Sequence, residues 1–124
     1  MIPTHIDTWQ MVEPGKLAQA RIAMPALGPD DVVVKIAGCG VCHTDLSYFY
    51  MGVPTIQKPP LTLGHEISGV VIGGRADLVG KEVIIPAVIP CGDCEICRSG
   101  RSNRCLEQHM PGYSMGIYGG FSSH

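Results

Sequence analysis

The stretch CGDCEICRSGRSNRC, residues 91–105, carries the strongest signal in the sequence. Its first three cysteines, Cys91, Cys94 and Cys97, are spaced three residues apart, and Cys105 follows after a short loop. Four thiolates this close along a chain can surround one ion tetrahedrally, which is the closed arrangement of a structural zinc site. Three arginines lie among these cysteines and could offset the negative charge of such a centre: Arg98, Arg101 and Arg104. We therefore expect residues 91–105 to form a four-cysteine zinc lobe.

Iron–sulfur and disulfide uses of these cysteines are less consistent with the sequence. The bacterial ferredoxin run also begins CxxCxxC, but its fourth cysteine comes sooner and is followed by Pro, whereas Leu106 follows Cys105. Disulfides are typical of oxidising compartments. The N-terminal residues MIPTHIDTWQ lack the basic and hydrophobic segments of a secretory signal, so we expect a cytoplasmic location and a metal.

Composition places the chain among folded proteins and excludes several classes of partner. The 124 residues are 45% hydrophobic and 16% charged, which suits a single folded domain. A net charge of −2 gives no reason to expect nucleic acid or an anionic membrane as a partner. No apolar run is long enough to span a bilayer. The 16 glycines and 10 prolines are scattered, as in a β-rich fold with many turns.

Short β-type runs bounded by Gly, Pro or Asp dominate the pattern and predict strands at 18–24, 32–37, 67–72 and 82–85. The continuous run Val32-Val33-Val34 is typical of a strand covered on both faces. A helix is expected at 44–51, capped by Thr44 or Asp45 and ended by Gly52, with a helical turn at 94–99. Residues 119–124 resemble the beginning of another strand. The sequence thus predicts a mainly β barrel or sandwich with short helices.

A second group of candidate ligands lies in GVCHTD, residues 40–45, and GHE, residues 64–66. Cys42, His65 and Glu66 are suitable ligands for a catalytic zinc, which keeps one position open for substrate. Thr44 could accept a proton from an alcohol bound there, and Asp45 could bond the free ring nitrogen of His65. From the residues alone a core role stays open, because a lone Cys–His pair is more often packing than ligand.

Other residues near these motifs have simpler interpretations. Cys39 is expected to be a small buried residue at a strand end, with no partner in view. The aromatic run Tyr48, Phe49 and Tyr50 is most simply helix packing. No GxGxxG follows a strand anywhere in the sequence, so no dinucleotide fingerprint is present.

Together the three motifs resemble the zinc-dependent alcohol dehydrogenases of the medium-chain dehydrogenase/reductase superfamily, in order and in spacing, over essentially the whole chain. The resemblance implies that residues 1–124 are a GroES-like catalytic domain, a partly open β-barrel. It also implies that this domain is C-terminally truncated, and that the Rossmann domain that binds most of the NAD is absent. The cysteines of the lobe would hold a structural zinc, and Cys42 and His65 a catalytic zinc whose third protein ligand lies beyond residue 124.

The same resemblance assigns roles to the residues around the catalytic zinc. Glu66 is the carboxylate that approaches the metal transiently, Thr44 relays the alcohol proton, and Asp45 is the partner of His65. His43 lies where many members place a basic residue against the cofactor pyrophosphate. Ser47 stands where some members have a histidine that passes the proton to solvent, so this proton would leave through Ser47, water or a cofactor hydroxyl.

The implied activity is oxidation of a secondary alcohol to a ketone with hydride transfer to NAD, by a full-length enzyme that is a homo-oligomer; residues 1–124 alone are expected to be inactive. Residues 80–90, the cysteine lobe and Met110-Pro-Gly are more narrowly similar to the 6-hydroxycyclohex-1-ene-1-carbonyl-CoA dehydrogenases of anaerobic benzoyl-CoA degradation. The expected substrate is then a small-molecule alcohol carrying a CoA thioester. Two alternatives are a dehydrogenase of simple aromatic or aliphatic alcohols and a non-catalytic, standalone zinc-binding module.

Overall fold

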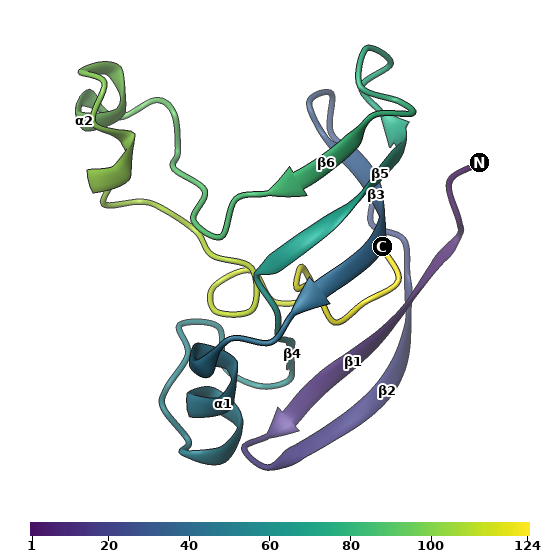
Figure 1. Ribbon diagram of the computed structural model, residues 1–124, viewed down its shortest axis with the longest axis vertical. Coiled ribbons are helices and arrows are strands. Elements are labelled where there is room, and N and C mark those ends of the chain that lie inside the picture. The colour runs from purple at the N-terminus through teal and green to yellow at the C-terminus, as the bar shows by residue number, and fades with distance from the viewer.

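The computed structural model describes all of residues 1–124 and contains two three-stranded antiparallel sheets (Figure 1). The first has the order β2-β1-β4 and the second the order β3-β5-β6. The strands are β1 (His5–Glu13), β2 (Lys16–Ala23), β3 (Val32–Gly40), β4 (Leu61–Thr62), β5 (Glu66–Gly74) and β6 (Glu82–Ile85). Two short helices, α1 (His43–Tyr50) and α2 (Glu95–Arg98), and a 3-10 helix, η1 (Ser102–Arg104), complete the fold. None of the helices combines the length and the apolar character that crossing a membrane requires.

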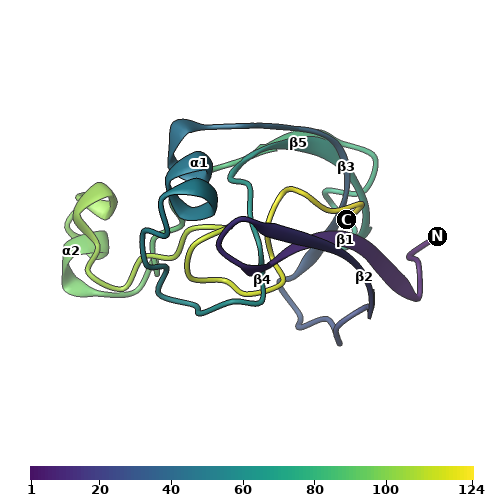
Figure 2. The ribbon, with the colours of Figure 1, turned by 90° about the horizontal axis from the view of Figure 1, so that it is seen from below.

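The C-terminal segment links the two sheets without closing them into a barrel. The Trp9 amide in β1 donates to the Phe121 carbonyl at 2.9 Å, and the Ile36 amide in β3 donates to the Ser123 carbonyl at 3.0 Å. Figure 2 shows this yellow segment running between β1 and β3. The expected C-terminal strand is present only as one bridge between Thr8 and Ser122. The predicted mainly β, partly open fold with short helices is confirmed.

Most of the predicted elements are present with shifted ends. β6 matches the prediction, whereas β2 begins two residues before the predicted 18–24 strand and β3 extends three residues beyond the predicted 32–37 strand. Strands β1 and β4 were not predicted. The expectation that Val32 to Val34 is covered on both faces is wrong, because only Val33, 5% exposed, faces the interior while Val32 is exposed. β3 lies at the edge of an antiparallel sheet with one face toward solvent, and its exposed and less exposed side chains alternate except at the register shifts after Val33 and Ile36.

Helix α1 packs on the first sheet and forms the core with it. The buried cluster contains Met11, Tyr48, Leu61 and Leu63, and the Tyr48 ring stacks on Tyr113 with centroids 5.7 Å apart. Helix packing by Tyr48 and Phe49 is confirmed. The same expectation for Tyr50 is wrong, because this side chain is 74% exposed on the last turn of α1 and touches only the edge of Phe49.

A buried pair of hydroxyl groups joins β1 to β4. The Thr8 and Thr62 side-chain oxygens lie 2.8 Å apart, and both residues are at most 3% exposed. Thr8→Val leaves the Thr62 hydroxyl buried without a partner, which should lower the free energy of unfolding by about 1–3 kcal/mol. Thr62→Val should cost less, because the Thr8 hydroxyl still donates to the Phe121 carbonyl at 3.3 Å. The double variant Thr8→Val/Thr62→Val should lose less free energy of unfolding than the two single variants added together, because it leaves no buried hydroxyl without a partner. Urea unfolding of the four proteins measures this coupling, and strictly additive losses would contradict it.

Candidate metal centres

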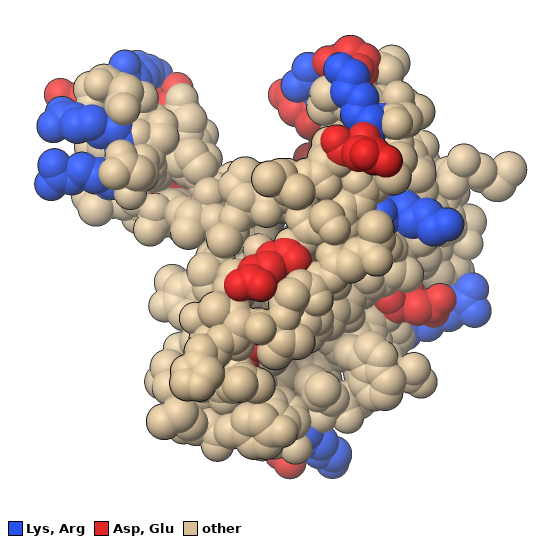
Figure 3. All heavy atoms as spheres, in the orientation of Figure 1, with Lys and Arg blue, Asp and Glu red and all other residues tan.

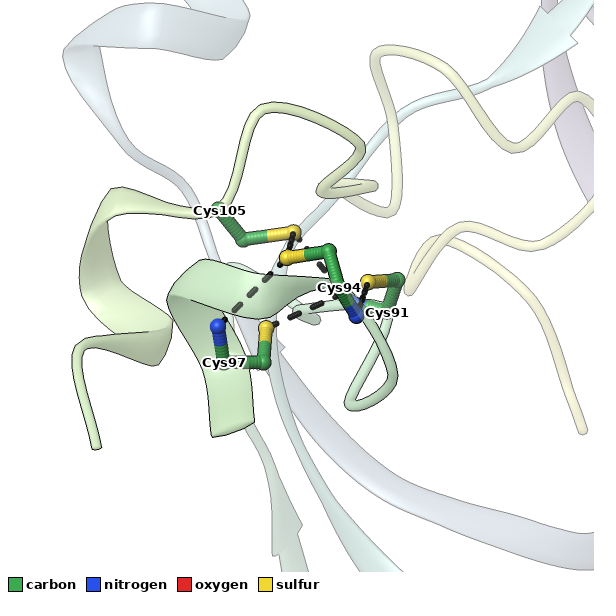
Figure 4. A group of neighbouring side chains, drawn as sticks. All are labelled: Cys91, Cys94, Cys97 and Cys105. Carbon is green, nitrogen blue, oxygen red and sulfur yellow. Dashed lines mark hydrogen bonds between the residues drawn. The ribbon is translucent and has the colours of Figure 1, made fainter. Parts of the chain in front are cut away.

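The four cysteines of the lobe converge as predicted (Figure 4). All four sulfurs lie within 4.8 Å of one another, and the sulfur–sulfur distance is 3.9 Å for Cys91 and Cys97 and 4.0 Å for Cys94 and Cys105. Local hydrogen bonds place them: the Cys94 sulfur caps α2 by accepting the Cys97 amide at 3.4 Å, and the Cys91 sulfur accepts the Cys94 amide at 3.3 Å. Four thiolate donors around one point, with no oxygen or nitrogen donor, fit a tetrahedral zinc.

The lobe is a projecting unit attached through a narrow neck. Figure 1 shows α2 set apart from the sheets, and at its base Ile89 and His109 exchange two backbone hydrogen bonds of 2.7 and 2.8 Å. Between residues 90 and 108 the only buried side chains are Cys97 and Cys105. The lobe therefore has no apolar core of its own, and the cysteines occupy the place where such a core would be.

The arginines of the lobe lie near the cysteine sulfurs without being hydrogen-bonded to them. Arg98, Arg101 and Arg104 are exposed, and Figure 3 shows basic atoms gathered over α2. The Arg98 guanidinium pairs with Asp93 at 2.6 Å, and Arg101 donates to the Ser99 hydroxyl at 3.1 Å. Arg98 and Arg101 thus bond other side chains of the lobe rather than the cysteine sulfurs.

The thiols of the lobe differ in how readily they ionise. The backbone amides of Asp93 and Cys94 lower the pKa of Cys91 to about 7. The amide of Cys97 also favours the thiolate of Cys94, yet burial and the neighbouring sulfurs raise the pKa of Cys94 to about 11. The first thiolate of the cluster is therefore stabilised, and further ionisation needs a compensating positive charge. A divalent cation at the centre of the cluster would supply this charge.

The second predicted group also converges, where strands β3 and β5 part. The last cross-strand pair is Gly40 with Glu66, so Cys42, at the start of α1, and His65, just before β5, both lie next to this point. Ligand atoms of Cys42, His65 and Glu66 lie within 4.8 Å of one another. Thiolate, imidazole and carboxylate form a donor set suited to zinc, and the accessible side of Glu66 leaves the site open.

A buried Asp–His pair stands behind this second site. Asp45, 2% exposed, accepts the Cys42 amide through Oδ2 at 2.9 Å. Its Oδ1 lies 3.6 Å from Nδ1 of His65, and these two atoms are the buried side-chain polar atoms without a hydrogen-bond partner. Because these two unpaired atoms face each other, a small movement of the side chains brings them within hydrogen-bond distance and leaves Nε2 of His65 free as a ligand. The arrangement accounts for both unpaired atoms.

The predicted start of α1 is wrong, and the hydrogen bond from the Cys42 amide to Asp45 lies at its true start. The helix begins at His43, with Cys42 as its N-cap, and not at Thr44 with Thr44 or Asp45 as the cap. Asp45 lies in the first turn and reaches back to the capping residue, as the acidic residue of a capping box does. Gly52 ends the helix as predicted, with a φ of 64° that favours glycine.

The remaining predicted site residues lie around the second group. The Thr44 hydroxyl is 3.6 Å from the Cys42 sulfur, so it stands beside the candidate ligands. His43 is exposed at the first position of α1. The Ser47 hydroxyl donates to the His43 carbonyl at 3.0 Å, one helical turn back. A proton path through Ser47 would therefore compete with a bond inside its own helix.

Residues 28–124 match the family model described as the alcohol dehydrogenase GroES-like domain. The chain belongs to this family. It is 39% identical, over 109 residues, to an alcohol dehydrogenase of Geobacillus stearothermophilus. The aligned region covers 84% of this chain and 32% of that protein. The chain thus spans about a third of the length of the curated relatives it matches.

Solved structures of family members have the same fold. Galactitol-1-phosphate dehydrogenase from Escherichia coli superimposes with a TM-score of 0.82 at 30% identity, covering 94% of this chain and 34% of that one. A zinc-binding dehydrogenase from Sinorhizobium meliloti, solved with NADP bound, gives 0.79 at 30% identity and covers 98% of this chain and 35% of that one.

Several glycines shape the second site in this family member. The Glu66 carboxylate lies so close to Gly40 that a Cβ there would overlap Oε2. Gly64, with a φ of 100°, precedes His65 and is packed against Gly112 and Gly120. Gly40 and Gly64 belong to the motifs GVCHTD and GHE, whereas Gly112 and Gly120 lie far from these motifs along the chain and meet Gly64 only in the folded structure. The half-buried Cys39 lies at the end of β3 as expected, and burial raises the pKa of its thiol.

Proposed function

We propose that residues 1–124 are the zinc-binding catalytic domain of a dehydrogenase that oxidises a secondary alcohol to a ketone with hydride transfer to a nicotinamide cofactor. The convergence of Cys42, His65 and Glu66, with Asp45 behind His65, is the observation that carries the proposal. A structural centre needs four closed ligands, as the lobe has, whereas this group offers fewer and opens toward solvent.

Each residue of the second group has a separate task. A zinc ion held by Cys42 and His65 supplies Lewis acidity, which makes an alcohol hydroxyl easier to deprotonate. Asp45 holds the His65 ring so that Nε2 faces the site, and Glu66 stands close enough to take part as a further ligand. The Thr44 hydroxyl, 3.6 Å from the Cys42 sulfur, would accept the proton of the alcohol and pass its own proton on to Ser47, water or a cofactor hydroxyl. A bound nicotinamide cofactor would supply the hydride acceptor, and exposed His43 would be the basic residue available to its pyrophosphate.

The rest of the machinery belongs to polypeptide of the kind that makes up the remaining length of the relatives. We place the nicotinamide-binding Rossmann domain, the third protein ligand of the catalytic zinc and the contacts of a homo-oligomer outside residues 1–124. Relatives about three times as long as this chain support this division. The cytoplasmic location stays a prediction from the sequence.

For the substrate, we favour a ring alcohol next to a CoA thioester, 6-hydroxycyclohex-1-ene-1-carbonyl-CoA, oxidised to its 6-oxo product. The support is the likeness of residues 80–90, the cysteine lobe and Met110-Pro-Gly to dehydrogenases of benzoyl-CoA degradation. Simple aromatic or aliphatic alcohols are the alternative within the family, and an alcohol dehydrogenase of Geobacillus stearothermophilus at 39% identity favours it.

Metal stoichiometry tests the two-centre proposal on this chain directly. The purified chain, titrated with Zn²⁺ and analysed for metal after gel filtration, should bind one ion tightly in the lobe and a second more weakly. His65→Ala should lose only the second ion, because the imidazole is one of few ligands there. His109→Ala is the matched control, since His109 is exposed and bonds Ser114 rather than a candidate ligand. A single ion in both the wild type and His65→Ala would favour the standalone zinc-binding module.

A chimera tests the chemistry. The matched part of the Geobacillus stearothermophilus alcohol dehydrogenase is replaced by this chain, and oxidation of alcohols is followed with NAD and with NADP. Thr44→Val should lower kcat by about 10²–10⁴-fold, the range of a positioned proton acceptor. The 6-hydroxycyclohexene CoA thioester, benzyl alcohol and ethanol are then compared by kcat/KM. Preference for benzyl alcohol or ethanol would overturn the CoA assignment while leaving the dehydrogenase proposal intact.

A further inference from the structure

We propose that Cys39 is a positioning residue whose sulfur sets the separation between Cys42 and His65; the inference rests on the metal-binding role proposed for those two residues. Cys39 is the last residue but one of β3, three residues before Cys42. Its cross-strand partner in β5 is Ile67, two residues after His65. Cys39 therefore lies where the two ligand-bearing segments are still held together by the sheet.

The Cys39 sulfur fills the space beside two buried glycines. A Cβ on Gly64 would lie 2.8 Å from the sulfur, and a Cβ on Gly120 would overlap it. Both glycines are therefore in direct contact with the sulfur through their backbones. Gly64 immediately precedes His65, so the sulfur bears on the backbone that carries this ligand.

The segment behind His65 is fixed from the other side as well. The Gly120 amide donates to the Gly64 carbonyl at 2.9 Å, and the Phe121 amide donates to the Leu63 carbonyl at 3.0 Å. The Cys39 sulfur, at the end of β3, thus contacts two further backbone segments, residues 63–65 and residues 119–121, which are hydrogen-bonded to each other. Phe121 also approaches Gly64 and Ile67 also approaches Gly120, but the Cys39 sulfur is the side-chain atom that these two close contacts share, so it is placed to limit how closely the two backbones approach β3.

Cys39 acts on the site without belonging to it. The Cys42–His65–Glu66 group does not include its sulfur, whose hydrogen-bond partner is the adjacent Gly40 carbonyl at 3.5 Å. A smaller side chain leaves a gap into which the Gly64 backbone can move, since glycine resists displacement least. A larger side chain pushes Gly64 outward. Both changes move His65 relative to Cys42 and should weaken metal binding there.

The test is a Co²⁺ titration of the chain with its lobe first filled by one equivalent of Zn²⁺. Binding at the second site is followed by the near-ultraviolet charge-transfer band of cobalt-bound thiolate. Cys39→Ala should weaken Co²⁺ binding about 10-fold or more, the effect typical of residues that orient metal ligands. Cys39→Ser, close in size and shape, should restore most of the affinity. Val34→Ala, which removes packing from the same strand far from the ligands, should leave Co²⁺ affinity unchanged even if stability falls.

The outcomes separate this inference from the proposed function. A wild type without any cobalt–thiolate band at the second site would contradict the proposed catalytic metal. A normal band in the wild type with equal affinity in Cys39→Ala would overturn only the positioning role. If Cys39→Ala does not unfold cooperatively, Cys39→Val decides, because overfilling should also lower the affinity and shift the band. Full affinity in Cys39→Val would overturn the role.

Discussion

Replacement of Cys97 by alanine is expected to abolish tight zinc binding by the lobe and to unfold the lobe while the two sheets stay folded. Outer-shell partners of a metal are already worth roughly 10–100-fold in affinity, so loss of a direct thiolate should cost more than about 100-fold. Cys97 is one of two buried side chains between residues 90 and 108. In this variant Cys105 is the one buried side chain left to hold the segment, and structural zinc contributes on the order of 10 kcal/mol to such folds.

Hydrogen exchange with mass spectrometry shows this local effect. Amides of α2 and of the 3-10 helix η1 (Ser102–Arg104) should lose protection in Cys97→Ala, whereas those of β1, β3 and β5 should keep it, because α2 and η1 make their main contacts with each other. Ser99→Ala is the control: its hydroxyl accepts from Arg101 and donates to the Ile96 carbonyl on an exposed part of the lobe. Retention of tight zinc by Cys97→Ala would contradict the four-thiolate assignment.

Asp45→Ala is expected to lower both the stability of the chain and its metal affinity at the second site. The change removes the acceptor for the Cys42 amide, a cap worth about 1 kcal/mol, and leaves buried groups unpaired at about 1–3 kcal/mol. The summed loss in free energy of unfolding should be about 2–4 kcal/mol. Metal affinity should fall roughly 10–100-fold, because the His65 ring loses the group that faces its Nδ1.

Asp45→Asn separates these two roles. Its side-chain oxygen can still accept the Cys42 amide, so stability should stay within about 1 kcal/mol of the wild type. Its NH₂ group, however, then faces Nδ1 of His65 and requires that nitrogen to be an acceptor, which puts the ring proton on Nε2. A protonated Nε2 cannot ligate, and Co²⁺ affinity should fall as in Asp45→Ala. Urea unfolding and the cobalt titration measure the two effects, and a fully metal-competent Asp45→Asn would refute the orienting role of Asp45.

The lobe was predictable from the sequence because its ligands lie within one short stretch. The spacing of Cys91, Cys94 and Cys97 fixes how close their sulfurs can come, and a single helical turn at α2 is enough to gather them. The second group was harder, since Cys42 and His65 are brought together only by the pairing of β3 with β5. The motifs singled out the right side chains, whereas their convergence depends on tertiary structure.

Strand β1 was missed because a polar residue, Thr8, lies on its inward face between the apolar Ile6 and Met11. Thr8 is 3% exposed, and its burial is made favourable by the Thr62 hydroxyl and the Phe121 carbonyl, both far along the chain. The pairing of β1 with the two-residue β4 has the same long-range origin. The N-cap at Cys42 was missed for a related reason, because cysteine is not a preferred capping residue and the hydrogen bond is supplied by Asp45.

The neck of the lobe has a consequence for protein engineering. Since Ile89 and His109 already face each other as a hydrogen-bonded pair, the intervening residues can be exchanged without moving the ends that must be rejoined. A two-residue Asn-Gly turn has the geometry to connect such an antiparallel pair. The lobe can therefore be removed, transferred to another hairpin or replaced by a foreign loop, while the two sheets keep their structure.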